Sequence, residues 1–405
     1  MRILHTSDWH LGKNLEGFSR MEEQESFLED FIETVKNKNI DMVIIAGDIY
    51  DSPNPPARAE KMFYDTLKKL SADGERITLV IAGNHDNPDR LAAAGPLARD
   101  HGIIMIGTPK STVEIGEYGR NRVVDSGEGF IEIEINGERA VILTVPYPSE
   151  KRLNEVLYDS MENEEERLKT YSDRIKMLFD NLSRKYRNDT INIAVSHLFA
   201  MGSEEAGSER SVQLGGSLIV DGCCFPGAAQ YVALGHIHKP QIVPGTNKRA
   251  RYAGSPIHYN KKEISFKKKC YIADVKANEE CSVEEVELKV YKPIEVWKCE
   301  SIDDAIKKCE ANRDNDCWVY LEIKTDRYIR EDEIKLMKSA KKDILEITPI
   351  IDGVDDEALD IGSLSDKSFK EIFEDFYMKE RNVKPQPEVV EMLLSVLQEE
   401  DNEAD

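Results

Sequence analysis

Seven side chains able to bind a divalent metal follow closely after apolar stretches of this sequence. They fall in five short motifs: S-D-W-H, G-D, G-N-H-D, S-H and G-H-I-H. The set comprises four imidazoles, two carboxylates and one amide oxygen, contributed by Asp8, His10, Asp48, Asn84, His197, His236 and His238. Nitrogen and oxygen donors without a thiolate suit Mn²⁺, Fe or Zn²⁺ better than an ion that binds oxygen alone.

The number of donors indicates two ions. One divalent ion cannot use seven protein ligands of this kind, but two ions can if a carboxylate bridges them, and Asp48 is the natural bridge. Two ions about 3.5 to 4 Å apart with a shared water form the clamp used for in-line displacement at phosphorus. Each motif alone is weak, because a single histidine or aspartate is more often structural. Five of the eight histidines lie in these motifs, and we expect His5, His101 and His258 to be structural.

Strands must position these motifs. Short runs rich in Ile, Val and Leu precede them and alternate with helical patterns: RILHTSD, MVIIAGD, ITLVIAGN, INIAVSH and YVALGHIH, with IIMIG as a further strand. Near-continuous apolar runs indicate burial on both faces, as in a parallel or mixed sheet covered by helices. Ligands bind at the carboxyl ends of strands in an open α/β sheet, so the five motifs are expected in one crevice.

Helical spacing of apolar residues predicts amphipathic helices over 27–39 and 61–70, and a polar helix over about 164–186. A hairpin is predicted over 131–145, with Asn136 and Gly137 in its tight turn. These elements form one α/β domain, residues 1–275.

A second domain is expected over residues 280–350, with a β-α-β-α-β pattern. Its first strand is predicted over 283–297, and its first helix carries a Ser301 to Asp304 capping box. Residues 363–405 form a tail with two amphipathic helices separated by a Lys-Pro-Gln-Pro break. Two such helices need a third surface, which is either their own catalytic domain or a groove on a partner protein.

Composition is typical of a soluble protein. A length of 405 residues predicts two or three domains, and no uncharged apolar run reaches the roughly 18 residues of a membrane span. The first residues lack the apolar stretch of a signal peptide. Seven cysteines, an odd number without a C-x-x-C pair, fit a reducing compartment. We therefore expect a cytoplasmic protein without a membrane partner.

The net charge of −23 is unusual for a nucleic-acid partner, but it is unevenly distributed. Residues 352–405 hold 17 acidic and 5 basic residues, about half of the excess. By contrast, residues 239–269 hold nine lysines and arginines and one acid, Glu263. Such a basic stretch beside a metal site predicts a track for DNA phosphates, with a solvated hairpin as the alternative.

The order D-x-H, G-D, G-N-H-D, H, G-H-x-H resembles the calcineurin-like metallophosphoesterase superfamily, over residues 1 to about 275. Within it, GDIYDSPNPP, YVALGHIHKPQ and RYAGSPIHYNKKE are similar to nucleases that process DNA ends together with an ATPase. The small second domain and the helical tail match that layout too. The fold class implied is α/β, with mixed β-sheets flanked by helices, a small α/β capping domain and a helical tail.

The resemblance also implies a role for each motif residue. One metal would be held by Asp8, His10, Asp48 and His238, and a second by Asp48, Asn84, His197 and His236. His85 would face the scissile phosphate as the catalytic proton donor or transition-state stabiliser, with Asp86 orienting it. Archaeal and eukaryotic relatives carry a further histidine where this chain has Asp51, so Asp51 is expected to be structural or to support the site from behind.

By the same resemblance, the activity is Mn²⁺-dependent hydrolysis of DNA, 3′ to 5′ from ends and endonucleolytic at hairpins or blocked ends, in DNA repair and recombination. An ABC-type ATPase would bind the tail, and a homodimer would form through the helix that carries Phe63 and Leu67. Two alternatives remain. One is another phosphodiesterase or a phosphatase of the superfamily, and the other is an adaptor that has lost catalysis.

Overall fold

The computed structural model describes residues 1–149, 151–153, 171–209 and 218–351. The chain divides into two units, Met1–Ile350 and Ile351–Asp405, and all but the first residue of the second lie outside the described residues. The predicted tail helices of 363–405 and the first part of the predicted 164–186 helix lie outside the described residues. Within the described part, no helix has the length and apolarity needed to cross a lipid bilayer.

Two mixed sheets form the larger part of the first unit. The first has the order β18-β17-β1-β4-β5-β6 and the second the order β15-β16-β14-β11-β10-β9-β8-β7. The strands of the first sheet are β1 (Arg2–Thr6), β4 (Met42–Ala46), β5 (Ile77–Ile81), β6 (Ile103–Ile106), β17 (Lys269–Asp274) and β18 (Ser282–Glu287). Those of the second are β7 (Gly116–Tyr118), β8 (Asn121–Gly127), β9 (Phe130–Ile135), β10 (Glu138–Val145), β11 (Ile191–His197), β14 (Tyr231–Gly235), β15 (Gln241–Ile242) and β16 (Ala250–Tyr252).

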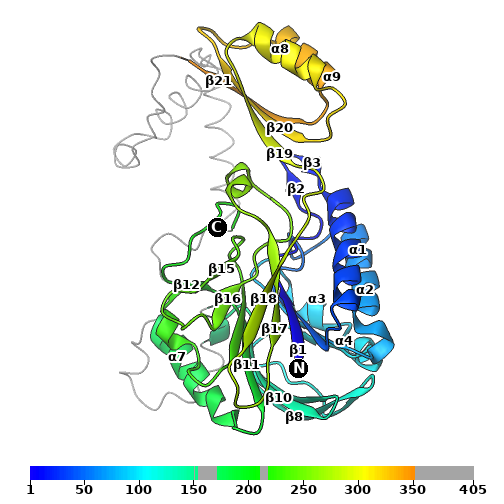
Figure 1. Ribbon diagram of the computed structural model, residues 1–405, viewed down its shortest axis with the longest axis vertical. Coiled ribbons are helices and arrows are strands. Elements are labelled where there is room, and N and C mark those ends of the chain that lie inside the picture. Colours follow the sequence, from blue (N-terminus) through cyan, green and yellow to red (C-terminus); the bar gives the residue numbers. More distant parts are fainter. Residues whose placement is uncertain (150, 154–170, 210–217, 352–405) are drawn as a thin grey trace, which may run out of the picture. The chain divides into compact units, whose positions relative to one another are not determined.

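Helices cover the outer faces of both sheets. Figure 1 shows α1 and α2 on one side and α7 on the other. The helices of this part are α1 (Met21–Asn37), α2 (Ala57–Ser71), α3 (Pro88–Ala92), α4 (Gly95–Ala98) and α7 (Tyr171–Leu182). The two predicted amphipathic helices are confirmed, and so is the hairpin turn, in which Asn136 and Gly137 have φ angles of 52° and 82°.

Successive side chains of each strand point to opposite faces of its sheet, and together they fill three apolar cores. In β4, Ile44 faces the core between the two sheets. Its neighbour Val43 faces the opposite side and packs with Phe31 of α1 in the core covered by α1 and α2. On the far side, the β11 residue Ala194 packs in a third core with Phe179 of α7. Full burial of one such large apolar side chain stabilises the fold by about 1.5–3 kcal/mol. The apolar runs read from the sequence are therefore strands buried on both faces, as predicted.

The single strand predicted over 283–297 is wrong. The structure forms two strands there: β18 pairs antiparallel with β17 in the first sheet, and β19 (Ile294–Cys299) begins a separate sheet. Pro293 immediately precedes β19, and a proline lacks the N–H that a continuous ladder needs. The separate sheet is parallel, with the order β19-β20-β21. Its other elements are α8 (Ile302–Ala311), β20 (Trp318–Lys324), α9 (Glu331–Ala340) and β21 (Ile344–Ile350).

This small sheet docks on a hairpin close to the first metal motif. Strands β2 (Asn14–Leu15) and β3 (Phe18–Ser19) form the hairpin, and its Leu15 packs with Trp318 and Tyr320 of β20. Trp318 Nε1 also donates a buried hydrogen bond to Glu23 Oε1 at 2.8 Å. The chain from His10 thus leads within a few residues to the surface that carries the small sheet. A further short pair, β12 (Phe199–Ala200) and β13 (Ile219–Val220), follows His197.

Candidate metal centre

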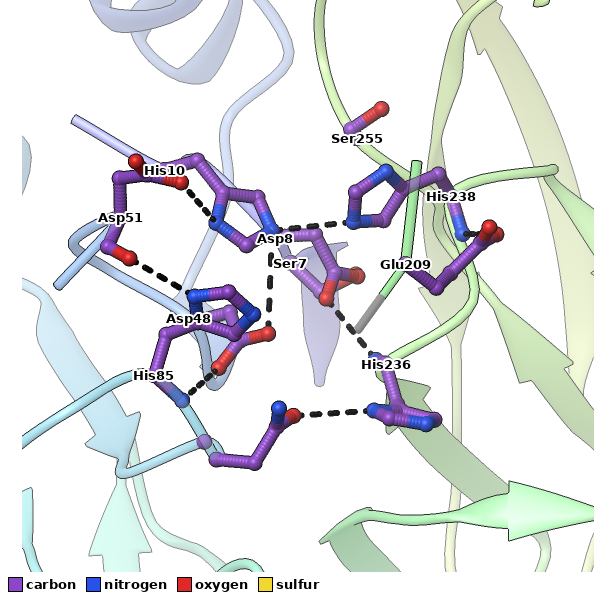
Figure 2. Close-up of polar contacts among 12 residues, drawn as sticks. Ser7, Asp8, His10, Asp48, Asp51, His85, Glu209, His236, His238 and Ser255 are labelled. Atoms are coloured by element: carbon purple, nitrogen blue, oxygen red, sulfur yellow. Dashed lines mark hydrogen bonds and ion pairs between the residues drawn. The ribbon is translucent and has the colours of Figure 1, made fainter. Parts of the chain in front are cut away.

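The five motifs converge where the carboxyl ends of the central strands meet. Strands β1, β4 and β5 are parallel neighbours in the first sheet, and β11 and β14 are parallel neighbours in the second. The candidate ligands gather between these ends (Figure 2). They form two groups in which the donor atoms lie within 4.8 Å of one another: Asp8, His10 and His238, and Asp48, His197 and His236.

Asn84 and Asp48 complete and connect the two groups. Asn84 Oδ1 lies 2.9 Å from His197 Nε2 and 2.9 Å from His236 Nδ1. Asp48 Oδ2 lies 3.3 Å from His197 Nε2 and 3.7 Å from His10 Nε2. The structure therefore brings together all seven predicted ligands, and the carboxylate predicted to bridge lies between the groups.

Glycines let the two sheets approach each other at this point. Gly47 has a φ of 88°, and a Cβ there would lie 2.3 Å from the His197 ring. A Cβ on Gly235 would lie 1.9 Å from the carbonyl oxygen of Ala46. Real Cβ atoms do not tolerate such distances, so larger residues would push β4 away from β11 and β14. The glycines in G-D and G-H-x-H are thus part of the site's geometry.

Four of the seven candidate ligands have left-handed backbone conformations. The φ angles are 53° for Asp8, 46° for His10, 51° for Asp48 and 103° for His236. A non-glycine residue in a sparsely populated region costs about 1–3 kcal/mol, and such residues cluster at functional sites. Hydrogen bonds between the turns maintain them, for example Asp8 N to Gly47 O at 3.0 Å.

The hydrogen bonds of two histidines direct their Nε2 lone pairs into the centre. His197 Nδ1 donates to the Ala46 carbonyl at 2.8 Å. His238 Nδ1 is hydrogen-bonded to the Ser208 hydroxyl, which in turn donates to Glu263. His238 Nε2 then lies 2.9 Å from His10 Nε2. Two ring nitrogens facing each other at this distance must share a proton or bind one cation.

The protonation states of the centre favour a cation. Burial lowers the pKa of His10 well below its ordinary value and that of His236 to about 3, so both rings are neutral and keep a lone pair. Burial alone would raise the pKa of Asp48, but His197 and other imidazoles hold it well below its usual range. Burial raises the pKa of Asp8 to about 6. The Asp48 carboxylate raises the pKa of His197 to about 9 despite burial, so this ring would release its proton when an ion binds. Divalent ions require neutral imidazoles and ionised carboxylates, and the residues fit such ions.

His85 stands beside the two groups, and its hydrogen bonds define its tautomer. Its backbone N–H donates to Asp48 Oδ1 at 2.9 Å, and its Nδ1 donates to the Asp51 carbonyl oxygen at 2.7 Å. The ring lies edge-to-face against that of His10, with centroids 4.7 Å apart. A proton on Nδ1 leaves Nε2 as the nitrogen that can exchange a proton with a substrate.

Asp51 contributes to this arrangement through its main chain. Its carbonyl oxygen fixes the His85 ring, while its carboxylate binds Lys13 Nζ at 2.8 Å and lies 3.6 Å from His10 Nδ1. A carbonyl oxygen is available from any residue type, so the residue identity at this position matters less to His85 than the turn itself.

Asp86 connects the turns that carry the ligands. Its carboxylate accepts hydrogen bonds from the backbone N–H groups of Gly83 (2.8 Å), Ile49 (3.2 Å) and Tyr50 (3.0 Å). These bonds tie the turn after β4 to the turn after β5. Asp86 thus orders the backbone around Asp48 and His85, and its hydrogen bonds do not go to the His85 ring.

Sequence reasoning missed a buried polar network behind His238. Glu263 and Lys268 are 0% and 1% exposed and form an ion pair. Lys268 Nζ also donates to the His238 carbonyl at 3.0 Å and to Ser255 Oγ at 2.7 Å. Figure 2 shows Glu209 on the same side, where its Oε1 accepts the His238 backbone N–H at 2.9 Å. The one available signal was Glu263, the single acid in the basic stretch.

The nine basic residues of 239–269 do not form one strip. Arg251 and Lys268 are buried, and Lys239 is paired with Glu204. Three of the nine are therefore not free to bind DNA phosphates, and the predicted track stays a prediction for the others.

Comparisons with known proteins agree with this fold. A family described as calcineurin-like phosphoesterase matches residues 1–240, and one described as type 5 capsule protein repressor C-terminal domain matches residues 290–381. The SbcD component of the nuclease SbcCD from Bacillus subtilis is 38% identical over 99% of this chain and 100% of its own length. The Escherichia coli K12 protein of the same name is 28% identical over 83% of this chain and 81% of its own. A dimetal phosphatase structure from Danio rerio, 12% identical, covers 70% of this chain and 98% of its own with a TM-score of 0.33, too low to inform function.

The chain therefore belongs to the calcineurin-like phosphoesterase family and, within that family, to the group of SbcD components of SbcCD nucleases. The expectation from the motifs is confirmed at this level. The second match begins close to the start of β19, the first strand of the small sheet.

The buried pair behind His238 leads to a stability prediction. Replacing Lys268 by Met leaves the Glu263 carboxylate buried without a counter-ion, because Lys268 is what holds the pKa of Glu263 below its ordinary value despite burial. We expect the free energy of unfolding to fall by about 3–5 kcal/mol. The double variant Lys268→Met with Glu263→Gln should regain part of that loss, measured by urea denaturation. If the losses in unfolding free energy of the two single variants simply add in the double variant, the pair is not coupled and the prediction is contradicted. The exposed Lys267→Met variant is the matched control.

Proposed function

We propose that this chain is a metal-dependent DNA nuclease that uses two divalent ions, most readily Mn²⁺. The observation that supports it best is the pair of donor groups connected by Asp48, with His85 beside them at the same edge of the sheets. Its relatives carry the name of a nuclease component. Phosphodiester hydrolysis, as a 3′ to 5′ exonuclease and as an endonuclease at structured ends, is the activity inferred from that relationship.

In this proposal, each ion has four ligands. One ion would be held by Asp8, His10, Asp48 and His238, and the other by Asp48, Asn84, His197 and His236. Bound divalent ions lower the pKa of water and neutralise the charge that develops on phosphoryl oxygens. Buried bonds such as His197 Nδ1 to Ala46 O keep the ligands oriented before any substrate arrives.

His85 is the proposed catalytic residue. With its ring doubly protonated, it would give the Nε2 proton to the oxygen that leaves phosphorus, while Nδ1–H stays on the Asp51 carbonyl and keeps the ring in the required orientation. Because its backbone N–H donates to Asp48, His85 is positioned by the same carboxylate that connects the two groups. The Asp48 side chain therefore positions the proposed proton donor as well as connecting the two donor groups.

The small sheet is proposed as a cap over the substrate side of this domain, within residues 280–350. It packs on the β2–β3 hairpin through Trp318 and Leu15, only a few residues beyond His10. Aromatic and charged groups are present at this contact, including Lys261, which lies over the Tyr320 ring at 5.2 Å. A DNA end approaching the centre would meet this surface.

Two protein partners complete the proposal. An SbcC-type ABC ATPase is proposed to bind the tail, residues 363–405, which would place ATP hydrolysis in the partner. A homodimer is proposed through α2. Its Phe63 and Leu67 are 0% and 1% exposed in the chain's own core, so these two side chains are not available to a second copy. A dimer would use the other face of α2, where Tyr64 is 37% exposed.

His85→Ala tests the proposed function. Purified chain with Mn²⁺ should release nucleotides from duplex DNA and leave a phenyl phosphomonoester largely intact. The variant should lose about 10²- to 10⁴-fold in DNA cleavage, because proton transfer to the leaving oxygen is removed, and should bind Mn²⁺ as the parent does. His101→Ala, outside the centre, is the control. A preference for the phosphomonoester would favour a phosphatase, and loss of Mn²⁺ would show that His85 is a ligand.

Removing residues 363–405 tests the ATPase partnership. The shortened chain should no longer co-elute with the ATPase in size-exclusion chromatography, while Mn²⁺ binding and the melting temperature stay close to those of the full chain, since every proposed ligand lies before residue 239. Co-elution that persists would contradict the tail as the binding segment. A truncated protein that unfolds would mean that the tail docks on its own chain.

A further inference from the structure

A second cavity lies at the opposite end of the strands from the metal centre. Its volume is about 700 Å³, and its lining includes Asn192 and Tyr231, which stand at the beginning of β11 and β14. The candidate ligand His197 is the last residue of β11, and His236 follows the end of β14. At about 3.3 Å per residue, five residues of strand separate the two sites by roughly 15 Å. The cavity is therefore independent of the site described above.

Arg251 is the unusual residue of this cavity. Its side chain comes from β16, is 9% exposed and lies with its guanidinium carbon 5.4 Å from the centre of the Tyr271 ring. Its Nε is buried without a hydrogen-bond partner. Among the described residues, no carboxylate lies within ion-pair distance of it. A buried guanidinium without a counter-charge is costly, since buried charges are normally paired.

Most of the other charged side chains around the cavity are basic. Lys248 and Arg249 line it, and neither forms an ion pair with a carboxylate in the part of the chain that the structure describes. Arg249 instead donates to backbone carbonyls, among them that of Ala229 at 3.1 Å. Glu279 and Glu280 also line the cavity, and Glu279 lies 3.8 Å from Lys276. Among the described residues, Arg251 is thus a buried cation without a carboxylate partner, and Lys248 is an exposed one.

We propose that this cavity binds a small phosphate-bearing molecule, with Arg251 as its main charge partner. A guanidinium presents parallel N–H donors that match a phosphate and bind it in a bidentate manner. A volume of about 700 Å³ lies within the range of small-molecule sites and accommodates a molecule as large as a mononucleotide. In a chain with a net charge of −23, such a concentration of unpaired cations gives an anion a specific place to bind.

The site connects to the core through Tyr231. This residue lines the cavity, and its hydroxyl is hydrogen-bonded to His5 Nδ1 at 2.9 Å. His5 Nε2 in turn is hydrogen-bonded to the Leu234 carbonyl at 3.2 Å. The wall next to Arg251 is therefore a fixed part of the sandwich, which favours a preformed site over a loop that closes on its ligand.

Equilibrium binding of two probes tests the proposal. The full chain is titrated calorimetrically with inorganic phosphate and with dAMP in EDTA, so that the metal centre does not contribute. Binding of phosphate would identify the free anion as sufficient, and binding of dAMP alone would show that sugar and base add contacts; either supports the site. Arg251→Gln should weaken the binding at least about tenfold, because charge-assisted hydrogen bonds are lost. The control Arg122→Gln, at an exposed arginine of β8, should bind as the parent does.

The proposal is overturned if the parent chain binds neither probe, or if Arg251→Gln binds as tightly as the parent. Thermal melting of each variant checks that it is folded. If Arg251→Gln does not fold, Arg251→Lys retains the charge and loses the bidentate geometry. It should then show weaker binding and a smaller rise in melting temperature with phosphate than the parent, and an unchanged rise would contradict the role of Arg251.

Discussion

The approach of two sheets at the carboxyl ends of their central strands is the constraint on which the rest depends. At that edge, Gly47 and Gly235 bring β4 against β11 and β14, at distances that exclude any Cβ. Asp48, the next residue after Gly47, then lies within 3.7 Å of ring nitrogens from both donor groups. The apolar cores hold the two sheets rigid. The glycines at this edge allow the close approach that fixes the spacing between the candidate ligands.

Burying so many polar groups away from solvent costs free energy, and the surrounding structure offsets this cost. The candidate ligands include carboxylates and imidazoles that are almost fully buried, and four of them have left-handed backbones. Hydrogen bonds from residues outside the ligand set offset part of this cost. Asp86 accepts three backbone N–H groups of the neighbouring turns, and Lys268, paired with Glu263, donates to the His238 carbonyl. An arrangement of this kind is ordered before substrate binds, which is how positioning lowers a reaction barrier.

The sequence allowed the candidate ligands to be predicted because each one lies at or just after the end of its strand, within a motif of two to four residues. It did not reveal the Glu263 and Lys268 pair, since burial of that pair depends on contacts made only in the folded chain. Burial within the basic stretch was missed for a related reason: Arg251 lies in β16 and is buried, while Lys248 lies in the preceding turn and is exposed. The boundary at Pro293 was missed because the strand pattern on both sides looks continuous.

The central claim is that two ions occupy the space between the donor groups. Titration of the full chain with Mn²⁺, followed by electron paramagnetic resonance, tests it most directly. We expect two tightly bound ions per chain with an exchange-coupled signal, since Asp48 would bridge them, and loss of that coupling in Asp48→Ala. A single bound ion, or two ions without magnetic coupling in the parent chain, would contradict it.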